Sequence, residues 1–323
     1  MLKKRLAESD QLINVAEHCG VLQGLSSTLR RLLRIRDAWS NVLDCENVSG
    51  CFCADDTNPS TRIALLLAKG RGLPTVACHH GALDCWMALK DVSADLYLAK
   101  SEMERDYLIN MCGVSRYKVA LGGPVASNVI HRTGANEKSW MVFFTEAYEA
   151  SGWRSDELYG DLLPRLQLLA ERCSLKLVLK LHPFDSIRDH RRKLKRILKS
   201  EARNIEIIAG SATADLWRNT KFALTCESST VLECAAQAIP VFLCTWLRDC
   251  YSGYSEQYAK FGAGVPLQSP EQIADIPELL TTRQASYAPV EEGIKPETFR
   301  GLFNPPIKDQ LMRNEPAVAA CAT

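Results

Sequence analysis

A strand, a helix and a second strand follow one another in residues 221–244, KFALTCESSTVLECAAQAIPVFLC. The apolar runs Lys221–Leu224 and Val241–Cys244 each predict a strand. The residues between them predict a helix that begins at three hydroxyl side chains, Ser228, Ser229 and Thr230. Such a unit is typical of a parallel sheet with right-handed crossovers.

The start of this helix has two possible roles. Its exposed N–H groups and the positive end of the helix dipole suit a phosphate, and the three hydroxyl groups add donors. Alternatively, one serine or threonine acts as an ordinary N-cap, with Glu233 in the second turn. The sequence of the helix alone leaves both open.

The same alternation extends through most of the chain, after a predicted helical region at residues 1–43. One series of strands is predicted at 48–54, 75–79, 94–99 and 118–121, and a second at 141–145, 175–181, 204–208 and 221–224. Helices are predicted between them, among them 58–69, 156–172, 186–200 and 214–219. A Gly-Gly-Pro break and a polar stretch, 127–138, separate the two series.

Two such series predict an α/β protein of two Rossmann-like domains, with parallel sheets facing across a cleft. We place the first domain at 1–133 and the second at 134–300, with a tail at 301–323.

Composition narrows the class of protein further. The net charge of +1 gives no whole-molecule attraction to nucleic acid. No apolar run approaches the roughly 18 residues of a membrane helix, and polar residues follow the basic start where a signal peptide would be apolar. The 13 cysteines show no Cys-x-x-Cys spacing, so we expect reduced thiols and no metal site. A cytoplasmic location follows as the expectation.

A histidine ends another predicted strand in residues 176–183, KLVLKLHP. Pro183 keeps His182 out of the helical region of backbone space, so His182 is held extended at the edge of the sheet. There it can donate to a phosphate oxygen or protonate a leaving phosphate. It can equally be a histidine that merely ends a strand.

The strand ending in His182-Pro183, followed by Glu227–Thr230 opening a helix that closes in Ile239–Val241, resembles the second domain of GT-B glycosyltransferases. The likeness is greatest to capsule-polysaccharide transferases, polysialyltransferases and CDP-glycerol glycerophosphotransferases, and spans residues 47–265 as a pattern. The resemblance implies donor-binding contacts from His182, Pro183, Thr145, Gly123, Glu227, Ser228, Ser229, Thr230 and Glu233. Within this set, Glu227 or Glu233 would contact the ribose or the donor glycosyl group.

The first series offers candidate catalytic residues in His79-His80-Gly81-Ala82-Leu83-Asp84. In the family a His-Gly after a strand faces the acceptor, which implies that His80, or next His79, takes the proton from an acceptor hydroxyl. Asp84 would orient that imidazole or act as the base itself. Alternatively the histidines are spectators beside a glycine turn. Asp55 and Asp56 also follow a strand end, where helix capping explains them equally well.

The resemblance implies that the first domain is on the acceptor side and that the second domain binds the nucleotide donor. A complete first domain of this family opens with further strands, whereas this chain begins with helix, so we expect either a shortened domain or a chain that lacks upstream residues. The resemblance implies a transferase that moves a group from a nucleotide-activated donor to a hydroxyl of a polysaccharide or glycolipid, without metal and without cofactor. One alternative is an isomerase like UDP-N-acetylhexosamine 2-epimerase, which shares the fold. Another is a non-catalytic protein that binds nucleotide sugars. The basic segment 188–199 is either a solvated outer helix or a peripheral contact with the inner membrane face.

Overall fold

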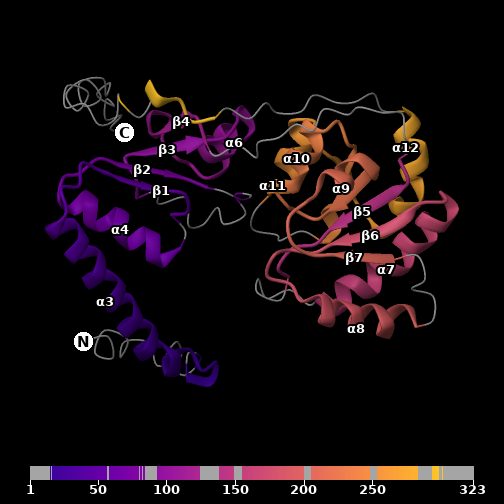
Figure 1. Cartoon of the computed structure of the whole chain (residues 1–323), viewed down its shortest axis with the longest axis horizontal. Helices are drawn as coiled ribbons and strands as arrows, with labels where there is room; N and C mark the ends of the chain where they lie inside the picture. The colour runs from indigo at the N-terminus through magenta and orange to yellow at the C-terminus, as the bar shows by residue number, and fades with distance from the viewer. Residues whose placement is uncertain are drawn as a thin grey trace, which may run out of the picture. The chain divides into compact units, whose positions relative to one another are not determined.

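The computed structural model describes residues 15, 17–56, 58–79, 81, 83, 93–123, 138–148, 155–199, 205–247, 253–282, 293–297 and 300. Figure 1 shows two sheets, each flanked by helices. By internal packing the chain divides into two compact units: Met1–Cys78 with Val92–Tyr97 and Lys295–Thr323, and His79–Asp91 with Leu98–Ile294. This division cuts through the first sheet at its third strand, and the predicted domain boundary at 133/134 stays a prediction.

The first sheet has the order β1-β2-β3-β4 among the described residues. Its strands are β1 (Cys51–Cys53), β2 (Thr75–Cys78), β3 (Leu96–Ala99) and β4 (Val119–Leu121). β1 and β2 are parallel, with Phe52 opposite Val76. Its helical segments are α3 (Val21–Cys45), α4 (Pro59–Gly70), α6 (Glu102–Asp106), a π-helical turn (Tyr107–Met111) and a 3-10 turn (Arg116–Lys118).

Local sequence explains where α4 begins. The Asn58 side chain accepts a hydrogen bond from the N–H of Ser60 at 2.9 Å, and Pro59 occupies the first helical position. Proline suits that position because its missing N–H would have no partner there. The start predicted at residue 58 is therefore confirmed to within one residue.

The second sheet has the order β10-β9-β8-β5-β6-β7, and its neighbouring strands are parallel. The strands are β5 (Trp140–Phe144), β6 (Lys176–Lys180), β7 (Ile205–Ile208), β8 (Thr220–Thr225), β9 (Val241–Cys244) and β10 (Val265–Leu267). The helices are α7 (Ser155–Arg172), α8 (Ile187–Leu198), α9 (Ala214–Asn219), α10 (Thr230–Ala236), α11 (Tyr254–Lys260) and α12 (Ile276–Thr282), with 3-10 turns at Thr245–Leu247 and Pro270–Asp275.

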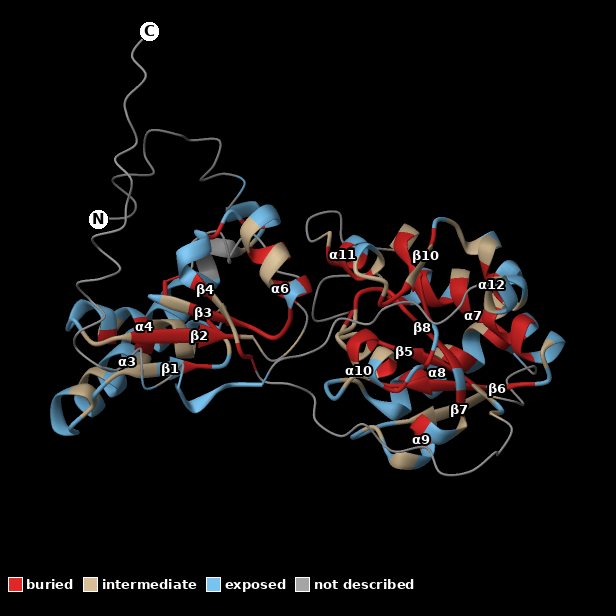
Figure 2. Cartoon of the chain, turned by 90° about the horizontal axis from the view of Figure 1, so that it is seen from above, coloured by how far each residue is buried: buried red, intermediate tan, exposed pale blue. Residues whose placement is uncertain are grey.

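The central strands β5, β6, β8 and β9 are buried along most of their length, as their continuous apolar sequences predict (Figure 2). Alternate side chains, such as Leu177 and Leu179, join the core beneath α7 and α8. On the opposite face the ring of Phe144 stacks on Trp217 of α9, at 5.8 Å between centroids. Figure 1 shows α7 and α8 on one side of the sheet and α9 and α10 on the other. The predicted α/β architecture with parallel sheets is confirmed.

Two predicted boundaries differ from the structure. The strand expected at 118–121 begins at Val119, because Arg116–Lys118 form a 3-10 turn. The helical region expected at residues 1–43 is a helix from Val21 to Cys45 within the described residues. The tail predicted at 301–323 lies outside them.

Candidate functional site

The carboxyl ends of three strands carry the polar residues of the candidate site. β5 lies between β6 and β8, and Thr145 and Glu146 follow it directly. The Thr145 hydroxyl accepts from the N–H of His182 at 2.9 Å, and Glu146 Oε1 accepts from the N–H of Glu227 at 2.7 Å. The His182 loop and the turn before α10 are therefore tied to opposite sides of one strand end. Since neighbouring strands lie about 4.8 Å apart, these two elements are roughly 10 Å apart.

The geometry around His182 makes its ring a hydrogen-bond donor. The N–H of Phe184 donates to His182 Nδ1 at 3.3 Å, so Nδ1 carries a lone pair and the ring proton sits on Nε2. Burial lowers the pKa of His182 below its ordinary value, which keeps the ring neutral at neutral pH. A neutral ring with a proton on Nε2 can donate to a phosphate oxygen. Pro183 is exposed.

The turn before α10 combines capping with unused donors. Ser228 Oγ accepts from the N–H of Thr230 at 3.4 Å and from the Thr230 hydroxyl at 3.1 Å. Ser229, at the N-cap position, makes no side-chain cap bond. Among the described residues, the Ser229 hydroxyl and the N–H groups of Ser228 and Ser229 have no hydrogen-bond partner. The Ser228 oxygen is thus used in capping as an acceptor, whereas the hydroxyl and N–H of Ser229 remain available as donors. Because α10 has only seven residues, its dipole is weak.

Lys180, the last residue of β6, also lies at this edge of the sheet, although the sequence pattern predicts it only as part of a strand. Its side chain is buried on the face of the sheet that carries α9 and α10, and its Nζ donates to the carbonyl of Leu181 at 2.9 Å. Burial lowers the pKa of Lys180, and the nearby Glu233 carboxylate opposes that shift. The sequence signal for Lys180 is a charged residue within a mostly apolar strand, at a position that is therefore expected to be buried.

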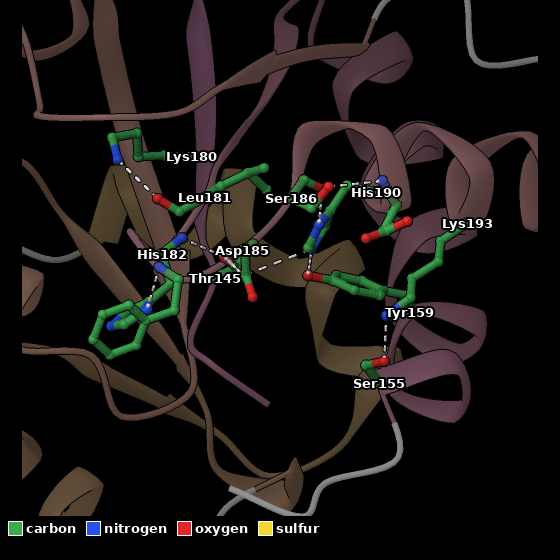
Figure 3. Close-up of polar contacts among 12 residues, drawn as sticks. Thr145, Ser155, Tyr159, Lys180, Leu181, His182, Asp185, Ser186, His190 and Lys193 are labelled. Atoms are coloured by element: carbon green, nitrogen blue, oxygen red, sulfur yellow. Dashed lines mark hydrogen bonds and ion pairs between the residues drawn. The ribbon is translucent and has the colours of Figure 1, made fainter. Parts of the chain in front are cut away.

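A buried polar network holds the His182 loop from behind (Figure 3). The Thr145 hydroxyl donates to Asp185 Oδ2 at 3.0 Å, and Asp185 Oδ2 lies 3.7 Å from His190 Nε2. His190 Nδ1 donates to the carbonyl of Ser186 at 3.1 Å, so Nε2 accepts from the Tyr159 hydroxyl at 2.8 Å. Burial raises the pKa of Tyr159, which keeps this hydroxyl protonated. Asp185, His190 and Tyr159 were missed because the contacts join α7, β5 and α8 across long sequence separations.

A buried carboxyl lies at the end of β1 in the first sheet. The Asp56 side chain is fully buried, and neither of its oxygens has a hydrogen-bond partner among the described residues. Burial is the largest cause that raises the pKa of Asp56 to about 6. The helix α4 is capped by Asn58, so the capping explanation for Asp56 is wrong. A carboxyl held in this way is a candidate acid or base.

A second buried cluster surrounds Lys100, which follows β3. Lys100 Nζ donates to the carbonyl of Gly81 at 2.7 Å and lies 3.5 Å from Glu104 Oε1, and both charged side chains are almost completely buried. The N–H of Gly81 donates to His79 Nδ1 at 3.0 Å, so the His79 ring carries its proton on Nε2. A Cβ at Gly123 would lie 2.5 Å from Lys100 Cγ, which explains a glycine there.

Two of the expected catalytic residues, His80 and Asp84, lie outside the described residues, as does Pro124. Whether the described His79 contributes to catalysis stays a prediction. Within the described part of the chain, no group of three or more histidine, cysteine or acidic side chains is placed to hold a metal ion.

Two parallel sheets flanked by helices, with polar residues at the strand ends, define an α/β fold of the GT-B type. Three solved structures share it over 87–88% of this chain and 80–81% of their own. They are a protein of Listeria monocytogenes assigned as a UDP-N-acetylglucosamine 2-epimerase (15% identity, TM-score 0.59), S. aureus MnaA with UDP (17%, 0.59), and the Methanocaldococcus jannaschii UDP-GlcNAc 2-epimerase with UDP-GlcNAc and UDP (15%, 0.57).

At these identities the likeness establishes the fold alone. The sequence matches no protein-family profile and no curated protein sequence. The specific resemblance to capsule-polysaccharide transferases and polysialyltransferases stays a prediction.

Proposed function

We propose that the second sheet binds the diphosphate of a nucleotide sugar at the carboxyl ends of β5, β6 and β8. The observation that carries this proposal is the pair of hydrogen bonds that tie His182 and Glu227 to the two residues following β5. With these two bonds in place, the His182 Nε2–H lies on one side of the end of β5, and the donors of Ser228 and Ser229 lie on the other side. A span of roughly 10 Å between these strands suits two linked phosphates rather than one.

We further propose that the reaction is an isomerisation at C2 of the sugar. The similar protein of Methanocaldococcus jannaschii is a UDP-GlcNAc 2-epimerase solved with UDP-GlcNAc and UDP, and S. aureus MnaA was solved with UDP. Inverting C2 breaks its C–H bond, and the electron pair of that bond can form a C1–C2 double bond while the bond from C1 to the diphosphate oxygen breaks. A proton then returns to C2 from the opposite face as the diphosphate adds back to C1. The group that takes this proton must also be able to return one, which requires a pKa not far from neutral.

Transfer of the sugar to an acceptor hydroxyl is the second candidate function. It is supported by the resemblance of the His182-Pro183 and Glu227–Thr230 elements to GT-B transferases. In that reaction His80 takes the acceptor proton, while His182 and the 228–230 turn stabilise the departing phosphate. The acceptor would be a hydroxyl of a polysaccharide or glycolipid.

One NMR experiment distinguishes these functions. UDP-N-acetylglucosamine is incubated with the full chain in D2O without an acceptor, and the sugar protons are followed. An isomerase produces a second set of sugar resonances and loses the proton signal at C2, because deuterium enters there. The Ser228→Ala, Ser229→Ala double variant should slow this exchange by roughly tenfold at low substrate concentration, whereas Asp215→Asn, at an exposed position on α9, should retain it.

Other outcomes assign the chain differently. Release of UDP only after a saccharide acceptor is added would support the transferase and contradict the isomerase. Line broadening of the nucleotide resonances without any reaction would support a non-catalytic binding protein. Absence of binding would contradict the proposed site itself.

A further inference from the structure

The helix α8 is strongly basic, and its cations lie mostly on one face. Its twelve residues include six lysines and arginines against one aspartate, whereas the whole chain has a net charge of only +1. Its buried residues are His190, Leu194 and Leu198, which pack toward the sheet. The basic side chains therefore project from the outer face of the helix.

Half of these cations are already occupied. Arg192 pairs with Asp189 at 3.2 Å, Arg196 pairs with Asp156, and Lys193 donates to Ser155 at 2.6 Å. Pairing of this kind is what a solvent-exposed outer helix ordinarily shows, and it requires no binding partner.

The other three cations, Arg188, Arg191 and Lys195, form no ion pair or side-chain hydrogen bond with any described residue. Together with Ile187 and Arg192 they line one open groove of about 480 Å³. Their charges are thus gathered in one place without an internal partner. A surface of this kind attracts an extended array of negative charge.

Exposed apolar side chains lie beside the cations. Phe184, in the loop that leads into α8, is 85% exposed, and Ile187 is 36% exposed. The Phe184 ring packs against the His182 ring in a T-shaped arrangement, with 5.0 Å between centroids. A soluble polyanion offers nothing to a bare phenyl ring, whereas the interface of a bilayer accepts aromatic and aliphatic side chains next to basic ones.

We propose that this face docks on an anionic membrane surface. Arg188, Arg191 and Lys195 contact lipid phosphates, while Phe184 and Ile187 enter the interfacial layer. Because the loop from His182 to Ser186 leads directly into α8, docking brings the candidate nucleotide site to the membrane surface. The proposal goes beyond the proposed function and does not depend on it.

Vesicle co-sedimentation of the full chain tests the proposal. We expect binding to phosphatidylcholine vesicles that contain about one-third phosphatidylglycerol, no binding to pure phosphatidylcholine, and weaker binding as salt rises. The double variant Arg188→Glu, Arg191→Glu should weaken binding by roughly tenfold or more, since each basic residue at the surface contributes severalfold. Phe184→Ala should weaken vesicle binding severalfold. The binding that remains should depend more strongly on salt than that of wild type, because the apolar contribution is lost.

The control is Arg116→Glu, Lys118→Glu, which makes the same change in net charge at exposed positions of the 3-10 turn before β4. It should bind anionic vesicles within about twofold of wild type, and melting curves should show that all variants are folded. Equal loss in the control would show a non-specific charge effect and overturn the proposal. Failure of the wild-type protein to bind anionic vesicles would also overturn the proposal, even if the same arginines bound heparin.

Discussion

Replacing Thr145 by valine tests whether the hydrogen bonds behind β5 position the nucleotide site. Thr145 is 3% exposed, and valine has nearly the same shape without the hydroxyl. The change removes the bond from the His182 N–H and the bond to Asp185 Oδ2. A neutral bond contributes about 1 kcal/mol and one to a carboxylate about 2 kcal/mol, so we expect a loss of about 3 kcal/mol in the free energy of unfolding by urea. With the His182 loop released, UDP affinity measured by calorimetric titration should fall by roughly tenfold, equivalent to about 1.4 kcal/mol.

Thr220→Val is the matched control for this variant. Thr220 is fully buried and donates to the carbonyl of Leu216 at the opposite, amino end of β8. It should lose about 1 kcal/mol of stability and keep its UDP affinity. The reasoning would be refuted if Thr145→Val bound UDP as wild type does, or if both variants lost affinity equally.

Three further changes probe the first sheet and its neighbours. The pKa of Asp56 is about 6 in the folded protein against an ordinary 3.8, so its contribution makes the free energy of unfolding fall as pH rises from about 4 to 6. Asp56→Asn should therefore be more stable than wild type at about pH 8, by up to roughly 3 kcal/mol in urea unfolding. Near pH 3.5 the two proteins should be equally stable. Gly123→Ala forces a Cβ to 2.5 Å from Lys100 Cγ and should cost about 1–3 kcal/mol, whereas Gly160→Ala, with open space inside α7, should stabilise slightly; melting temperatures compare them. Lys100→Met leaves Glu104 buried without its cation and should cost about 3–5 kcal/mol, most of which the added Glu104→Leu change should recover.

The residues that could be predicted from sequence are those whose placement follows from strand periodicity. Strand ends in a parallel sheet share one edge, so His182 and Ser228 could be assigned to that edge from apolar runs alone. The capping of α4 by Asn58 and the cap of α6 by Ser101 are likewise local signals, and the structure contains both.

The remaining parts of the site depend on contacts between segments far apart in the sequence. Asp185 meets Thr145 across 40 residues, and Tyr159 meets His190 across 31, so no local pattern reveals these pairs. Asp56 illustrates a different difficulty, because an aspartate before a helix is usually a cap. Only its complete burial, with Asn58 taking the capping role, distinguishes it.

The most direct test of the central claim is a calorimetric titration of UDP into wild-type protein and into the Ser228→Ala, Ser229→Ala double variant. The account predicts one site per chain in wild type and an affinity lower by roughly tenfold or more in the variant, since two hydroxyl donors to a charged phosphate are lost. The melting temperature should fall only slightly, because Ser228 Oγ loses two long hydrogen bonds from Thr230, at 3.4 and 3.1 Å, and Ser229 has no side-chain bond to lose. Equal affinity in the two proteins would contradict the placement of the nucleotide at these strand ends.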